Sequence, residues 1–110
     1  MTAGELAREL LEYFGPSGEH WVQRRLTNGL SGAEGKRCFH GAVTEIVLGR
    51  PQYSDRLDLV VAPFAEKVRE QHPRPYHSIA RRPMHVMESF NDASTWEEFQ
   101  AILEKVAAGE

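Results

Sequence analysis

Apolar residues near the start of the chain recur at the spacing of one helix face. They lie three or four positions apart, and they are Ala3, Leu6, Ala7, Leu10, Leu11 and Phe14. Thr2 and Glu5 have the spacing of a capping box, in which each side chain satisfies a backbone N–H at the helix start. Gly15 and Pro16 end the pattern, because glycine permits the left-handed conformation after a helix and proline cannot continue the helix. The pattern therefore predicts a helix over residues 3–14.

The C-terminal part of the chain repeats this arrangement. A second apolar stripe consists of Trp96, Phe99, Ile102, Leu103 and Val106. Thr95 or Ser94 is expected to cap this helix, with Glu98 or Glu97 three residues further on. Helix capping then explains the pair of glutamates, which would otherwise be the obvious candidates for paired catalytic carboxylates.

Two more helices are predicted in the middle of the chain. Residues 38–48 carry apolar side chains on one face and are followed by Gly49, a C-cap, although their β-branched content leaves a strand as the alternative. Residues 57–68 also keep helical spacing. Pro63 lies within that stripe, so it either kinks one helix or belongs to the first turn of another.

Glycines and prolines mark the connections between these helices. Residues 21–37 contain Asn28, Gly29 and two further glycines, which favours a β-hairpin or an irregular Gly-rich loop. Residues 71–83 contain three prolines and are expected to be extended with at most one helical turn, before a short helix over 84–90. The predicted fold is mainly α-helical: one compact domain over residues 1–110, with about four to five helices.

Composition agrees with such a domain. The chain has 110 residues, of which 41% are apolar and 26% charged, with a net charge of −3. Its longest apolar run, residues 59–65, is far shorter than the roughly 18 residues of a membrane-spanning helix. Cys38 is the single cysteine, so an intramolecular disulfide and a four-cysteine zinc site are both excluded. We therefore expect a soluble cytoplasmic protein without a membrane association.

Cys38 is the candidate for nucleophilic chemistry. At the start of a helix its thiol would meet the positive end of the helix dipole, and Lys36 and Arg37 would lower its pKa further. The spacing identifies no histidine as its base, although such an enzyme needs an oriented Cys–His pair. We interpret Cys38 as a small buried thiol. An enzyme centred on Cys38 and a histidine stays the alternative.

Three histidines are the candidates for metal ligands: His72, His77 and His85. They are separated by five and eight residues, which matches neither a histidine pair on one helix nor the spacing of a zinc finger. We therefore expect no metal and no cofactor. A metal-binding protein is an alternative, together with the enzyme centred on Cys38 and a histidine.

Positive charge gathers in residues 67–85. This segment has a formal charge of +4, from five basic residues and one acidic residue, whereas residues 86–110 have −5, from six acidic residues and one basic residue. The candidate binding residues of the basic segment are Arg74, Tyr76, His77, Arg81 and Arg82. Such a segment suits an acidic protein surface. It also suits nucleic acid, through arginine–phosphate contacts and a stacking tyrosine, but a pI near 5.9 favours the protein partner.

Several short motifs follow one another along the chain, and their residues are Trp21, Gln23, Cys38, Gly41, Asn91 and Asp92. The chain thereby resembles a family of small uncharacterised proteins found in actinobacteria and their phages. The family pattern is W-x-Q, then C-x-x-G-A-[LV], then W-N-D. Phe90 replaces the usual tryptophan, and the turn after Gln23 is basic and longer. The resemblance covers most of the chain and implies no activity.

Physical roles for three of these residues can be stated without the family. Gly41 is expected to permit a close approach of another backbone segment. Asn91 and Asp92 are expected to form a helix C-cap followed by an Asx turn.

The leading hypothesis for function is a non-catalytic intracellular interaction or regulatory domain that acts through residues 67–85. It follows from the lack of any nucleotide-binding or hydrolase motif, together with one region of concentrated positive charge. A homodimer is compatible with this hypothesis, because the apolar stripe of a short helix can pack against its symmetry mate.

Overall fold

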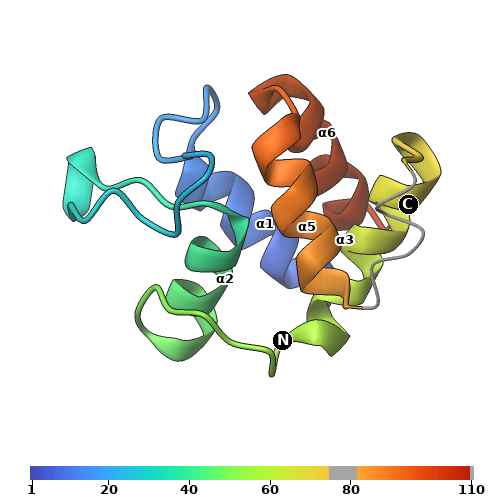
Figure 1. Ribbon diagram of the computed structural model, residues 1–110, viewed down its shortest axis with the longest axis horizontal. Coiled ribbons are helices and arrows are strands. Elements are labelled where there is room, and N and C mark those ends of the chain that lie inside the picture. The colour runs from blue at the N-terminus through green and yellow to red at the C-terminus, as the bar shows by residue number, and fades with distance from the viewer. Residues whose placement is uncertain (75–81, 110) are drawn as a thin grey trace.

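The computed structural model describes residues 1–74 and 82–109, and it folds them into five α-helices and one short 3-10 helix (Figure 1). The helices are α1 (Ala3–Phe14), α2 (Phe39–Leu48), α3 (Asp58–Gln71), α5 (Pro83–Ala93) and α6 (Trp96–Ala107), and the 3-10 helix η1 covers Gly32–Glu34. The prediction of a mainly α-helical fold is confirmed. Among the described helices, none is long and apolar enough to cross a membrane.

Both terminal helices begin where the sequence predicts. Thr2 Oγ1 accepts a hydrogen bond from the backbone N–H of Glu5 at 3.1 Å, and Glu5 Oε1 accepts from the N–H of Thr2 at 3.0 Å. Thr95 and Glu98 form the same reciprocal pair in α6, which selects these two from the predicted alternatives. The two helices then pack against each other, so that both ends of the chain contribute to one core.

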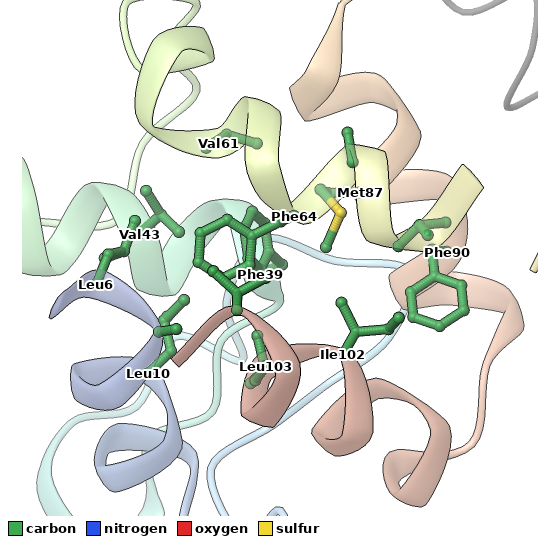
Figure 2. Close-up of a cluster of buried hydrophobic side chains, with 14 of the residues drawn as sticks. Leu6, Leu10, Phe39, Val43, Val61, Phe64, Met87, Phe90, Ile102 and Leu103 are labelled. Carbon is green, nitrogen blue, oxygen red and sulfur yellow. The ribbon is translucent and has the colours of Figure 1, made fainter. Parts of the chain in front are cut away.

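Apolar side chains from all five helices meet in this core (Figure 2). Phe39 from α2 and Phe64 from α3 lie at its centre, edge to face, with 5.3 Å between their ring centroids. Every phenylalanine of the chain is fully buried, and these are Phe14, Phe39, Phe64, Phe90 and Phe99. The two tryptophans pack against the edge of the core and keep part of their surface exposed. The phenylalanines and tryptophans therefore belong to the core and its edge.

The middle of the chain differs from the sequence prediction at several helix boundaries. α3 continues through Pro63 as one helix and ends at Gln71, inside the segment expected to be extended. Pro63 leaves the carbonyl of Leu59 without its helical N–H partner, and Leu59 is an almost fully exposed residue. α5 extends to Ala93, three residues beyond the expected end at 90. Residues 75–81 of the predicted connector lie outside the described part of the chain.

Residues 15–38 form an irregular loop beside α1 and α2, at the left of Figure 1. Among the described residues, its β-type pairing is limited to two isolated bridges, which join Arg37 to Trp21 and to Thr27. Of the two predicted alternatives, the structure therefore has the irregular loop and not the hairpin. Leu26, in the middle of this loop, lies against Gly41 of α2, whose residues 39–44 are all buried.

Candidate functional site

The residues that carry the family resemblance come together in space. They lie where the loop 15–38 meets the start of α2 and the end of α5, although 70 residues separate Trp21 from Asn91. Asn91 is at the centre of this group, and its side chain is fully buried.

Each polar atom of the Asn91 side chain has a hydrogen-bond partner. Its carbonyl oxygen Oδ1 accepts from the indole N–H of Trp21 at 2.7 Å and from the backbone N–H of Phe39 at 3.0 Å. Its amide nitrogen Nδ2 donates to the backbone carbonyl of Val22 at 3.0 Å and to Asp92 Oδ1 at 3.2 Å. One side chain thus ties the loop to the first residue of α2. We call these contacts, with those of Gln23 and Asp92, the Asn91 network.

Gln23 and Asp92 complete the network at the end of α5. Gln23 Nε2 donates to the backbone carbonyls of Asn91 and Ser94, at 2.9 and 2.8 Å. Asp92 Oδ1 accepts from the backbone N–H of Arg24 at 2.7 Å, and this holds Arg24 in a left-handed conformation with φ +64°. Terminal carbonyls of a helix need partners from outside the helix, and here a remote glutamine supplies the donor.

The predicted role of Asn91 and Asp92 as a helix C-cap is wrong. Both residues lie inside α5, which ends with Ser94 as its C-cap. The C-cap prediction relied on the preference of asparagine and aspartate for turns. That local preference is outweighed because three hydrogen bonds with other segments, to Trp21, Val22 and Phe39, hold the Asn91 side chain.

Cys38 is the N-cap of α2 and is buried, with 8% of its surface exposed. Its Sγ accepts from the backbone N–H of Gly41 at 3.4 Å. Burial raises the pKa of the Cys38 thiol, and this outweighs the opposing hydrogen bonds from Gly41 and His40. The structure therefore favours the interpretation of Cys38 as a structural thiol.

We expect the Cys38 thiol to be unreactive in the folded protein, because it is buried and its pKa is raised. Alkylation by iodoacetamide at pH 8, followed by mass spectrometry, should be at least roughly a hundredfold slower for the folded protein than in urea. N-acetylcysteine under the same conditions gives the rate of an accessible thiol. Rapid alkylation of the folded protein at pH 7 would contradict this and would support the enzyme alternative.

The candidate metal ligands have different surroundings. His72 packs against the Phe90 ring, with 4.9 Å between centroids, and its Nδ1 is 4.0 Å from Glu98 Oε2. His85 lines a surface cavity with His40, and His77 lies outside the described residues. In residues 1–74 and 82–109, no group of three or more His, Cys, Asp or Glu side chains is arranged to hold a metal ion.

That surface cavity, of about 470 Å³, lies beside the connection between α2 and α3. The buried His40 forms part of its wall: Nε2 accepts from the backbone N–H of Ser54 at 3.0 Å. Nε2 also lies 3.1 Å from the backbone carbonyl oxygen of Ser54, and Nδ1 lies 3.3 Å from Glu88 Oε1. The ring of Tyr53 meets the imidazole edge to face, with 5.4 Å between centroids.

Of the predicted binding residues, Arg82 has a structural role that its sequence position does not reveal. Its guanidinium contacts the Asp58 carboxylate, with Nη2 2.8 Å from Oδ2, and donates through Nη2 to the backbone carbonyl of Asp55 at 2.8 Å. Arg82 therefore links the start of α5 to the start of α3. Arg74 is exposed, whereas Tyr76, His77 and Arg81 lie outside the described residues.

Large apolar side chains reach the surface mainly near the same connection. Within the described part of the chain, six such side chains are exposed, and four of them lie between residues 47 and 59: Val47, Leu48, Tyr53 and Leu59. We call these four residues the 47–59 surface. Helical periodicity did not identify it, because it placed Val47 with the buried face of α2, and Tyr53 follows no periodic pattern.

The chain matches no protein-family model, no curated protein and no solved structure. The resemblance to the small actinobacterial and phage proteins therefore stays a prediction.

Proposed function

We propose that this protein is a non-catalytic intracellular interaction domain that binds a protein partner through the 47–59 surface. The observation that carries the proposal is the exposure of Tyr53 (72%) and Leu59 (94%), which lie six residues apart. Single exposed apolar residues are common, but four within one short stretch of the chain make that stretch a candidate interaction site. Tyrosine is also enriched among the residues that dominate binding energies at protein interfaces.

The cavity beside Tyr53 supplies the polar part of such a site. Its lining includes Asp55, Glu88 and the exposed His85, which can hydrogen-bond to a partner at the edge of the apolar contact. An apolar centre with a polar rim is the usual composition of an interface.

This surface also adjoins the basic segment 67–85 that the sequence analysis singles out. His85, the last residue of that segment, lines the cavity, and Arg82 is bonded to Asp55 in the connection between α2 and α3. The non-catalytic part of the proposal is supported by Cys38, whose thiol is buried and caps a helix. Because the 47–59 surface adjoins the basic segment 67–85, the partner contacts residues of both.

The test is partner capture by affinity purification from native cells with a double variant, Tyr53→Ser with Leu59→Ser. We expect the double variant to retain less than about a tenth of the partner held by the wild type, since interface anchors carry most of the binding energy. Leu30→Ser is the matched control, because Leu30 is 49% exposed and lies outside the 47–59 surface. All variants should keep the wild-type thermal midpoint, because the altered side chains are exposed.

Two outcomes would contradict the proposal. One is equal capture by the wild type and the double variant, and the other is the lack of any specific partner of the wild type. Loss of capture after nuclease treatment would instead support the nucleic-acid alternative. Arg74→Glu, added to the same experiment, measures the contribution of the basic segment. Arg82 is unsuitable for this purpose, because its reversal would break the link between α5 and α3.

A further inference from the structure

A second cavity, of about 220 Å³, lies where the Gly-rich part of the loop meets α1 and α2. Its lining includes Tyr13 from α1, Glu45 from α2, and His20, Ser31 and Arg37 from the loop. The 47–59 surface contributes no residue to it, so the following inference does not depend on the proposed function.

The Arg37 guanidinium is buried beside this cavity with few hydrogen bonds. Its side chain is 7% exposed, and among the described residues it makes one hydrogen bond, from Nη1 to the backbone carbonyl of Lys36 at 2.9 Å. Its Nε lies 3.5 Å from Glu45 Oε2 and has no hydrogen-bond partner in the described chain. A guanidinium has five N–H donors, and a buried cation is costly unless these donors are satisfied. The Arg37 guanidinium is therefore ion-paired with Glu45 and still has an N–H donor without a hydrogen bond.

Glu45 places an acceptor next to this donor. The Tyr13 hydroxyl donates to Glu45 Oε2, and burial together with this carboxylate raises the pKa of Tyr13, so the phenol stays protonated. The other oxygen, Oε1, accepts no hydrogen bond in the described part of the chain and can accept one from a ligand. The Ser31 hydroxyl, which caps no helix, is a further donor in the lining. The cavity thus has a cationic donor and an anionic acceptor side by side.

We propose that this cavity binds phosphate as the hydrogen phosphate ion. Two of its oxygens would accept from the Arg37 guanidinium, whose planar fork matches the spacing of phosphate oxygens. Its one P–O–H group would donate to Glu45. A dianion of the same shape that has no proton would face the Glu45 carboxylate with an oxygen lone pair. The repulsion between the two oxygens would then prevent binding. The volume accommodates the ion together with water molecules.

Sulfate provides the discriminating comparison, because it has the size and charge of hydrogen phosphate but no proton at pH 7. Isothermal titration at constant ionic strength should show saturable 1:1 binding of phosphate and binding of sulfate at least about tenfold weaker. In Glu45→Gln the amide can donate to either ion, so the two affinities should differ by less than about threefold. Glu104→Gln, the same change on α6 at an exposed site outside the cavity, should keep the wild-type preference.

Arg37→Lys tests the cationic donor. It keeps the charge but loses the fork, and it should weaken phosphate binding at least about tenfold. If this variant does not fold, Glu45→Gln still tests the proposal, because the Glu45 side chain is 29% exposed and glutamine has nearly the same shape.

Three results would overturn the proposal: no saturable phosphate binding to the wild type, equal binding of phosphate and sulfate, or an unchanged preference in Glu45→Gln. O-phosphoserine separates the free ion from a phosphate ester. A phosphomonoester has a second pKa near 6 and therefore lacks the proton at pH 7. It should bind as weakly as sulfate, and binding as tight as that of phosphate would overturn the role of the proton.

Discussion

Replacement of Asn91 with alanine is expected to destabilise the protein by about 3–5 kcal/mol. The substitution leaves three groups without their partner: the Trp21 indole N–H, the Phe39 backbone N–H and the Val22 carbonyl. Each buried polar group without a hydrogen bond costs about 1–3 kcal/mol, and the lost side-chain volume adds a small cavity. A change of this size is a large share of the stability of an ordinary domain, which is about 5–15 kcal/mol.

Urea unfolding followed by far-UV circular dichroism measures this loss, because the five helices give the same signal in variants with and without Trp21. Trp21→Phe is the control, since it removes one hydrogen bond to Asn91 and keeps an aromatic ring against the core. We expect this control to cost about 1 kcal/mol. A loss below about 1 kcal/mol for Asn91→Ala would mean that water replaces the network, contrary to its burial.

Gly41→Ala is expected to destabilise the protein by about 2–4 kcal/mol, because it introduces a steric clash into a buried helix. A Cβ added at Gly41 would lie 2.3 Å from the backbone oxygen of Leu26, much closer than any van der Waals contact allows. The same oxygen accepts a hydrogen bond from the N–H of Cys38 at 3.2 Å. Moving the loop to relieve the clash would therefore also weaken the start of α2.

Gly4→Ala is the matched control, because it is the same substitution within another helix. A Cβ at Gly4 would have its nearest neighbours at 3.7 Å, an ordinary contact distance. Alanine is the better helix former, so this variant should gain about 0.5–1 kcal/mol. Urea unfolding of both variants should give opposite signs. A gain in stability for Gly41→Ala would show that the loop 15–38 is not held against α2.

Helix positions were predictable from the sequence because their causes are local. Periodicity and capping act between residues no more than four positions apart, and Thr2 with Glu5 and Thr95 with Glu98 form the pairs that their spacing indicates. The close backbone approach at Gly41 was also predictable, since glycine lacks the Cβ that prevents it. Its partner, Leu26, was not, because the path of an irregular loop has no periodic signal.

The candidate sites depend on contacts between residues far apart in the chain. The partner of Asn91, Trp21, lies 70 residues away, so the local sequence indicates only a cap. The partner of Arg82, Asp58, lies 24 residues away, so the local sequence indicates only an exposed binding residue. The pKa of Cys38 likewise depends on residues that are distant in the sequence. Local sequence predicts a lowered pKa from the helix start and two preceding cations, whereas burial under distant segments raises it. The sequence alone thus determines where the helices lie and where the two terminal helices begin, because those hydrogen bonds are local. Only the tertiary structure decides which side chains are buried and paired, because desolvation and long-range hydrogen bonds depend on the packing of the whole chain.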